Sequence, residues 1–296
     1  MEKEKKVQDD LHINWYPGHM KKTKEQIIEN LKLVDVAIEL VDARAPYSSS
    51  NPDIEEMLGT LPKVLVLNKA DLASDEKTQD WLRYYRERGQ ESVAVNAMTG
   101  GGIRELLSAL ERETALLYRK LEEKGRRKRA LRILIVGIPN VGKSSLINRI
   151  VGKKSAKTGD RPGVTKGKQW IKLKGDMELL DTPGVLWPKM EDPFAALKLA
   201  FLGSIKDRTT EIEEIMAELM GFLKERHPEV YKERFGVEVS EIDSLEELMN
   251  GIAGKRGYML SGGRVDYARL ANAFLMDFRA GKLGKITLET PQEMSV

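Results

Sequence analysis

The first two thirds of the chain alternate between short apolar runs and longer segments with helical periodicity. Each run is four to six residues long and is followed by a polar residue or a glycine loop. The four runs are Val36–Val41, Val64–Leu67, Ser92–Val95 and Leu131–Val136. Runs that are apolar at nearly every position are typical of strands buried on both faces of a parallel sheet. We therefore expect an α/β fold with a mostly parallel sheet and helices on both faces.

The pattern changes along the second half of the chain. Gln169–Leu173 and Met177–Leu180 flank a short polar turn and are expected to form an antiparallel strand pair. After about residue 190 apolar residues recur at helical spacing, as at Ile215, Leu219 and Phe222. We therefore expect two domains. Residues 1–190 form the α/β domain, with an N-terminal extension (1–30), a first half (31–121), a charged connector (122–130) and a second half (131–190), and residues 195–296 form a helical domain.

Composition narrows the class of protein. Hydrophobic residues make up 41% and charged residues 32% of the 296 positions, which is typical of a globular protein. The absence of cysteine excludes a disulfide framework, cysteine-ligated zinc or iron–sulfur clusters, and thiol catalysis. The charged start of the chain is unlike a signal peptide, and no apolar run is long enough to cross a membrane. We expect a cytoplasmic protein with no membrane partner.

Basic residues are concentrated in parts of the sequence although the net charge is only +3. Arg149–Lys174 contains nine Lys or Arg residues and one acidic residue. Lys124–Arg132 contains six Lys or Arg residues and no acidic residue. Such segments indicate a polyanionic partner that contacts one side of the protein. Solvated lysines on an ordinary charged surface are an equally good interpretation of the charge alone.

The loop after Leu131–Val136 carries a phosphate-binding motif. Gly137–Ser144 matches G-x-x-x-x-G-K-[ST], with a strand before it and a helix expected after it. Backbone N–H groups of such a loop and the N-terminus of its helix bind phosphates. Lys143 is expected to contact the β- and γ-phosphates, and the Ser144 hydroxyl to bind Mg²⁺. The residues expected to contact the nucleotide here are Pro139, Asn140, Val141, Gly142, Lys143, Ser144 and Ser145.

A second motif follows the strand pair. Asp181–Gly184 reads D-x-x-G, and its aspartate is expected to hold Mg²⁺, directly or through water. Gly184 has no side chain, so its backbone can approach a γ-phosphate. Thr165 lies between the two phosphate motifs and is expected to complete the Mg²⁺ coordination and to take part in catalysis.

A third motif indicates the base. Asn68–Asp71 reads N-K-x-D at the end of a strand. The Asp71 carboxylate can accept hydrogen bonds from guanine N1–H and the exocyclic amine, a donor pair that adenine lacks. Lys69 can lie along the base, and Asn68 can brace the phosphate loop. The loop of Asn96, Ala97 and Met98 is similar to an S-A-K loop, which contacts guanine O6 through backbone N–H groups.

The order of these motifs is unusual. In common GTPases the phosphate loop comes first and N-K-x-D follows, whereas here N-K-x-D comes first. The sequence therefore resembles the circularly permuted GTPases, and within them the ribosome biogenesis GTPase A family. The resemblance covers nearly the whole chain and rests on Trp15–Met20, Asp42–Pro46, Asn68–Asp71, Gly137–Ser144, Asp181–Gly184 and Arg279–Gly284.

This resemblance implies a GTP-hydrolysing switch that assists late assembly of the large ribosomal subunit. It implies GTP or GDP and Mg²⁺ as ligands, precursors of the large subunit and rRNA as partners, and RNA binding by the helical domain. The free protein is expected to be a monomer. Two other interpretations stay open, namely a constitutive RNA-binding assembly scaffold with a structural nucleotide pocket, and a GTPase that acts on another RNA.

The catalytic machinery lacks one familiar part. Many GTPases orient the attacking water with a glutamine after D-x-x-G, but here Val185 stands in that position. The resemblance points to His19 as the group that holds the water, although His19 is equally suited to packing or an RNA contact. Asn140 matches GTPases that bind K⁺ beside the phosphates, but it is also an ordinary polar loop residue.

Overall fold

The computed structural model describes residues 25, 28–123, 125, 129–152, 170–173, 176–180, 193–205 and 212–294. The chain divides into two compact units. The first, here called the sheet unit, comprises residues up to Ala195 together with those from Thr287 onward. The second, called the helical unit, comprises Ala196–Ile286.

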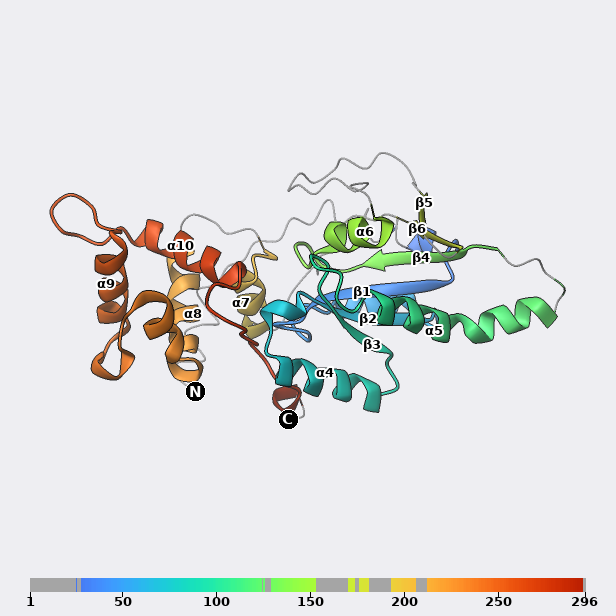
Figure 1. Cartoon of the computed structure of the whole chain (residues 1–296), viewed down its shortest axis with the longest axis horizontal. Helices are drawn as coiled ribbons and strands as arrows, with labels where there is room; N and C mark the ends of the chain where they lie inside the picture. The colour runs from blue at the N-terminus through green and yellow to red at the C-terminus, as the bar shows by residue number, and fades with distance from the viewer. Residues whose placement is uncertain are drawn as a thin grey trace. The chain divides into compact units, whose positions relative to one another are not determined.

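The sheet unit is built, in its described residues, on six strands, coloured from blue to yellow-green in Figure 1. In chain order these are β1 (Val36–Asp42), β2 (Lys63–Asn68), β3 (Ser92–Val95), β4 (Leu131–Val136), β5 (Trp170–Leu173) and β6 (Met177–Leu180). Their order across the sheet is β3-β2-β1-β4-β6-β5. Every neighbouring pair is parallel except β5 and β6, which are antiparallel. All six expected strands are thus confirmed, each within one residue of its expected bounds.

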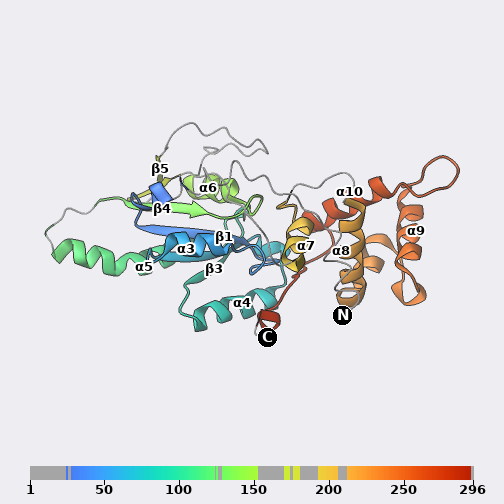
Figure 2. The same ribbon diagram turned by 180° about the vertical axis from the view of Figure 1, so that it is seen from behind.

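Helices cover both faces of this sheet (Figures 1 and 2). On one face α3 (Pro52–Leu58) packs through Ile54 and Leu58 onto apolar side chains of β1, β4 and β6, and α4 (Asp75–Glu87) inserts the fully buried Trp81 against β1 and β2. Two further helices of the unit are α5 (Ile103–Glu123) and α6 (Lys143–Val151). No helix in the described ranges is long and apolar enough to cross a membrane.

The helical unit contains, where it is described, α7 (Pro193–Phe201) from Ala196 onward, the helices α8 (Ile212–Arg226), α9 (Leu245–Arg256) and α10 (Tyr267–Arg279), and a short π-helical turn at Tyr231–Phe235. Its core includes stacked aromatic rings, with Phe274 centred 5.5 Å from Phe235 and 6.3 Å from Tyr231. Ser244 caps α9 by accepting a hydrogen bond from the Glu247 N–H, as its S-x-x-E spacing indicates.

The end of the chain differs from the expectation. The sequence predicts one helical domain over residues 195–296, but Thr287–Met294 packs with the sheet unit. We call this segment the C-terminal strap. Its Met294 packs beside Trp81, and the backbone carbonyl of Glu289 accepts a 3.1 Å hydrogen bond from the Trp81 indole. The physical reason is that the strap accepts hydrogen bonds from the Ser74 N–H at the start of α4 and from Trp81, and adds Met294 to the apolar cluster around Trp81.

An ion pair joins the connector to the sheet. Arg129 donates two hydrogen bonds, of 2.7 and 2.6 Å, to the two carboxylate oxygens of Asp35, just before β1. The Arg132 N–H donates a third, of 3.0 Å, to the same carboxylate. Asp35 is only 9% exposed, so these contacts replace water and hold the start of β1 beside the start of β4.

We therefore expect Arg129→Ala to lower the free energy of unfolding by about 1–2 kcal/mol, because it leaves a mostly buried carboxylate short of two donors. Urea denaturation followed by circular dichroism measures the change. Arg112→Ala is the matched control, since Arg112 pairs with Glu91 at an exposed position and should cost at most about 1 kcal/mol. Equal decreases in the two variants would contradict a structural role for the Arg129 pair.

Candidate functional site

Three loops that carry the sequence motifs leave the same edge of the sheet. Strands β2, β1 and β4 are neighbours and parallel, and β3 is parallel to β2, so their carboxyl ends lie together. In parallel α/β sheets this edge is where ligands bind. The three loops are Asn68–Asp71 after β2, Asn96–Gly100 after β3 and Gly137–Gly142 after β4.

The two motif glycines of the loop after β4 are required by close packing. Gly142 has φ +98°, and a Cβ there would lie 2.3 Å from the side-chain nitrogen of Asn68. Gly137 has φ +154°, and a Cβ there would lie 2.4 Å from the Leu40 carbonyl oxygen of β1. Any larger side chain at either position would push the loop away from β1 or β2.

Helix α6 begins at Lys143, directly after this loop. Its N-cap residue Gly142 provides no side-chain hydrogen bond, so the first turn has backbone N–H groups to offer to an anion. Lys143 donates hydrogen bonds to the carbonyls of Gly137 (2.8 Å) and Ile138 (2.6 Å), which keeps its ammonium within the loop. Ser144 and Ser145 follow in the first turn and are half-buried. This arrangement suits a phosphate chain.

Asn68 connects all three loops. Its side-chain nitrogen donates a 2.7 Å hydrogen bond to the carbonyl of Val141, and its side-chain oxygen accepts one of 3.2 Å from the Ala97 N–H. Its own backbone carbonyl accepts from Ala43 N–H at the end of β1. The bond to Val141 is the bracing contact expected from the sequence. Because Asn68 is 1% exposed, no water can replace these partners.

Lys69 reaches from the loop after β2 to the phosphate loop. Its ammonium donates a 2.6 Å hydrogen bond to the carbonyl of Asn140 and lies 2.9 Å from a carboxylate oxygen of Asp42. Lys69 (φ 59°) and Asn140 (φ 62°) are two of only three non-glycine residues with positive φ among the residues described. Such backbone strain is tolerated where surrounding contacts hold the conformation, often at functional sites.

Asp42 is a buried anion below this lysine. Burial alone would raise the pKa of its carboxyl, but the Arg44 guanidinium and the Lys69 ammonium hold that pKa well below its usual range. Arg44 donates two 2.9 Å side-chain hydrogen bonds to the two carboxylate oxygens and is itself only 1% exposed. Asp42 is therefore ionised in the folded protein and can orient Lys69.

Asp71 has the environment expected of a ligand-binding carboxylate. It lies in a short 3₁₀ turn, Ala70–Leu72, and its side chain is exposed. Among the residues that the structure describes, no donor lies within hydrogen-bonding distance of its carboxylate. Its acceptor capacity is therefore available to a bound molecule.

The loop after β3 is held by hydrogen bonds between its own residues. The side-chain oxygen of Asn96 accepts hydrogen bonds from the N–H groups of Met98 (2.9 Å) and Thr99 (3.0 Å), while Met98 itself is 71% exposed. The Ala97 carbonyl accepts a 3.1 Å hydrogen bond from Arg149 of α6. The N–H groups of Ala97 and Met98 already donate to Asn68 and Asn96, so the expected contact with a base requires one of them to donate to a second acceptor or to leave its present one.

Some expected site residues cannot be placed. His19, Thr165, Asp181 and Gly184 lie outside the described residues. The structure also adds two residues to the site, namely Asp42, which the sequence singled out only as part of the Asp42–Pro46 motif of the resemblance, and Arg149, which it counted only within a basic segment. Asp42 stands where a strand ends, as Asn68 and Asn96 do, and that position was the available signal.

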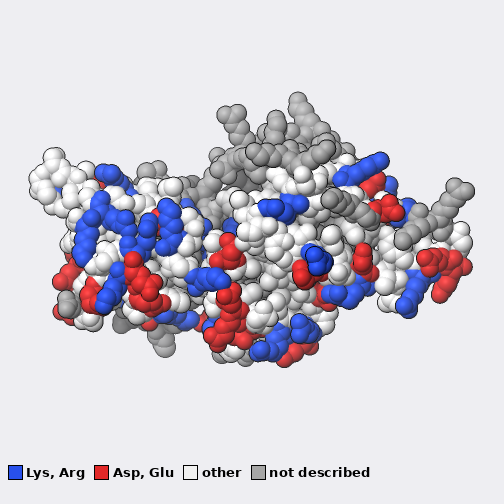
Figure 3. Space-filling model, viewed as in Figure 1, with Lys and Arg blue, Asp and Glu red and all other residues white. Residues whose placement is uncertain are grey.

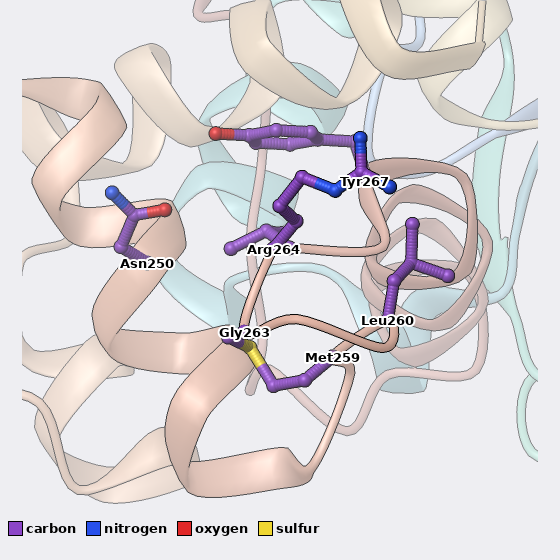
Figure 4. Close-up of a pocket in the computed structure, with 7 residues that line it drawn as sticks. Asn250, Met259, Leu260, Gly263, Arg264 and Tyr267 are labelled. Atoms are coloured by element: carbon purple, nitrogen blue, oxygen red, sulfur yellow. The ribbon is translucent and has the colours of Figure 1, made fainter.

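A separate hollow of about 510 Å³ lies in the helical unit, between α9 and the loop that precedes α10. Figure 4 shows the side chains around it. Its lining is mixed, with apolar, aromatic and basic groups, and consists of Asn250, Met259, Leu260, Gly263, Arg264, Val265 and Tyr267. None of these residues belongs to the three loops of the sheet unit.

Known proteins resemble the chain over most of its length. A profile of the family described as 50S ribosome-binding GTPase matches residues 132–233, starting within β4, so that the N-K-x-D half precedes the match. Ribosome biogenesis GTPase A of Bacillus cereus is 48% identical over 282 residues, which is 95% of each chain. The protein of that name from Thermotoga maritima is 31% identical over 283 residues, or 96% of each chain.

Solved structures agree with the fold. The GNP-bound structure of YlqF from T. maritima has a TM-score of 0.62 and 29% identity, covering 92% of this chain and 99% of the other. The GDP-bound YlqF structure gives a TM-score of 0.62 with 28% identity over 90% of this chain and 99% of the other. These likenesses confirm the P-loop fold, and the order of the motif-bearing strands confirms its permutation. The chain therefore belongs to the ribosome biogenesis GTPase A family of circularly permuted P-loop enzymes that hydrolyse GTP.

Proposed function

We propose that this GTPase is a molecular switch that binds rRNA in precursor particles of the large ribosomal subunit and assists their late assembly. The observation that carries the proposal is the convergence of the three motif loops on one edge of the sheet, where Asn68 joins them. Relatives named for ribosome biogenesis, 48% and 31% identical over nearly the whole chain, support the ribosomal part of the proposal.

The guanine base is bound by the loops after β2 and β3. Asp71 accepts hydrogen bonds from the base, Lys69 lies along its plane, and Asn96, Ala97 and Met98 form the wall near O6. The exposed Asp71 carboxylate and the fixed position of Lys69 support these roles. YlqF structures that contain GDP or GNP show guanine-type nucleotides in proteins of this fold.

We expect Asp71→Asn to weaken GTP binding at least about 100-fold and to improve binding of xanthosine triphosphate, because the amide replaces an acceptor with a donor. Fluorescence titration with labelled nucleotides measures both affinities. Asp75→Asn is the matched control, since Asp75 is an exposed aspartate in the first turn of α4 and should change neither. Unaltered GTP affinity in Asp71→Asn would remove Asp71 from the base pocket.

The phosphates and Mg²⁺ are bound by the loop after β4. Backbone N–H groups from Asn140 to Ser145 face the phosphates, Lys143 neutralises their charge, and the Ser144 hydroxyl is a Mg²⁺ ligand. The N-terminus of α6, which has no side-chain cap, suits the phosphate anion, and the Ser144 hydroxyl in its first turn suits Mg²⁺, which prefers oxygen ligands. Bound Mg²⁺ neutralises charge that develops on the phosphates during hydrolysis. We assign Asp181 and Thr165 to the same ion, Gly184 to the γ-phosphate and His19 to the attacking water, from the sequence alone.

Potassium completes the phosphate site in this proposal. Asn140 lies at the exposed tip of the phosphate loop with its backbone in the left-handed region, where its side chain can contribute an oxygen to a monovalent cation. A cation there supplies positive charge beside the phosphates, as an arginine finger does in other GTPases.

We expect GTP turnover to be about tenfold or more faster in potassium than in sodium at equal ionic strength, since an arginine finger contributes about 10³-fold or more. Asn140→Ala should abolish the difference between the two salts. Phosphate release under saturating GTP measures it, with Asn148→Ala on α6 as the control that keeps the difference. Identical rates of the parent protein in both salts would exclude the ion.

RNA is bound in part by a basic surface on the helical unit. Lys and Arg side chains gather on the visible face of this unit in Figure 3. Four exposed cations of α9, α10 and the loop between them have no carboxylate partner among the described residues, namely Lys255, Arg256, Arg264 and Arg269. We call these four the α9–α10 basic surface. Cations without a carboxylate partner bind phosphates without first breaking an ion pair.

The hollow beside this surface is suited to an unpaired base. Tyr267 offers an aromatic ring, Asn250 an amide and Arg264 a planar cation around the same space (Figure 4). Bases of single-stranded RNA stack on aromatic rings and guanidinium groups and form hydrogen bonds along their edges. The basic segments 124–132 and 149–174 are the other proposed RNA contacts, and most of their residues lie outside the described ranges.

We expect the double variant Arg264→Gln/Arg269→Gln to bind large-subunit precursor particles more weakly. The slope of log affinity against log salt should fall by about 0.7–0.9 for each phosphate that the variant no longer neutralises. The control is Lys232→Gln/Lys282→Gln, which removes the same charge but should leave the slope unchanged. These two lysines already pair with Glu238 (2.8 Å) and Asp277 (3.1 Å). Co-sedimentation with the particles across a salt series measures the affinity and the slope for the parent protein and both double variants. The same slope in the parent and both variants would place the RNA-binding surface elsewhere.

A further inference from the structure

The C-terminal strap carries a fully buried carboxylate that the GTPase motifs leave unexplained. Glu289 is 0% exposed. One of its carboxylate oxygens accepts hydrogen bonds from the N–H groups of Tyr47 (2.5 Å) and Ser48 (3.0 Å), and the other accepts one of 2.5 Å from the Ser48 hydroxyl. A carboxylate buried with three donors is a strong, charge-assisted anchor for the loop that provides them.

That loop, residues 43–50, follows β1 and is bound by the strap at other points as well. The Leu288 N–H donates a 2.7 Å hydrogen bond to the carbonyl of Arg44. On the strap's other side, the hydroxyl of Thr287 accepts a 3.0 Å hydrogen bond from the N–H of Ser74, the N-cap residue of α4. The strap is thus held between loop 43–50 and α4 within the sheet unit.

The same loop carries Arg44, which orients the Asp42 carboxylate beside Lys69. Arg44, whose carbonyl accepts from the strap, binds both carboxylate oxygens of Asp42. Asp42 lies 2.9 Å from the Lys69 ammonium, which in turn donates to the Asn140 carbonyl of the phosphate loop. Polar contacts of 2.5–3.1 Å therefore connect Leu288 and Glu289, through loop 43–50, to the phosphate loop.

We propose that the C-terminal strap is a working part of the nucleotide site, in which Glu289 and Asp42 are positioning residues that hold Lys69 against the phosphate loop. The proposal rests on the role of Lys69 at the base described above. It assigns to the last residues of the chain a contribution to nucleotide affinity, although the motifs of the site end more than 100 residues before them.

The need for such positioning follows from the side chain itself. A lysine has a long, flexible side chain that loses much rotational freedom when it is fixed. The Lys69 side chain is 25% exposed, so packing alone does not immobilise it. Its two polar partners hold it before any nucleotide arrives, which lowers the ordering cost of binding. Releasing loop 43–50 from the strap removes the support of one of these partners.

The test compares nucleotide affinity in two strap variants of the full chain. Glu289→Ala should weaken binding of fluorescent GDP about tenfold, a coupling of the size found between residues of one hydrogen-bond and salt-bridge network. Glu289→Gln, which keeps an acceptor for the two N–H groups, should restore most of the affinity. Glu293→Ala is the matched control, because its carboxylate accepts from Thr290 within the strap and it should bind as the parent does. All affinities are measured where circular dichroism shows each variant folded.

A double-mutant cycle separates positioning from general stability. If the strap acts through Lys69, Glu289→Ala should cause no further decrease of GDP affinity in a Lys69→Ala background. The proposal would be overturned if the decreases of GDP affinity in Glu289→Ala and Lys69→Ala multiply in the double variant. It would also be overturned if Glu289→Ala binds GDP as tightly as Glu293→Ala does. Parental affinity in Lys69→Ala alone would instead refute the base pocket, and the strap proposal with it. If Glu289→Ala does not fold, Ser48→Ala, which removes one of the three donors, takes its place in the cycle.

Discussion

The side-chain amide of Asn68 donates to the Val141 carbonyl of the phosphate loop and accepts from the Ala97 N–H of the neighbouring loop. These partners are 73 and 29 residues away along the chain, and the amide is buried among them. Leaving any of these groups unpaired would cost about 1–3 kcal/mol, so the three loops keep one relative arrangement. The close approach that this requires also explains why position 142 must be glycine, because a Cβ there would collide with the Asn68 amide.

A sheet of parallel strands tolerates the permutation because its loops depend on which strands are neighbours and not on where the chain begins. The order β3-β2-β1-β4-β6-β5 brings β1 and β2, from the first half, beside β4, from the second. The ion pair of Arg129 with Asp35 fastens the connector between the two halves at the far end of β1. The C-terminal strap returns to the sheet unit, so chain that packs in the sheet unit both precedes and follows the helical unit.

Most of the sheet unit could be predicted from the sequence. Strands β1, β2 and β4 are recognisable because nearly all their residues are buried, which makes them mostly apolar, and the cap of α9 is recognisable because Ser244 and Glu247 interact over one turn. The motif loops are predictable because phosphate and base binding demand particular residues at fixed spacing. Helix α3 is one of the helical segments expected between the apolar runs, and Asn51 and Pro52 at its start are ordinary signals for a helix N-terminus.

The sequence by itself determined the fold class, the permuted order of the motifs and the residues of the three loops, because each of these depends on local patterns a few residues long. Only the tertiary structure decided that Asp42 orients Lys69 and that Glu289 belongs with loop 43–50. Glu289 and Ser48 are 241 residues apart, and a glutamate near a chain end has the same sequence signal whether it is solvated or buried. The difference lies in the donors that surround it, Tyr47 and Ser48, which meet Glu289 only when the strap packs against loop 43–50 and α4.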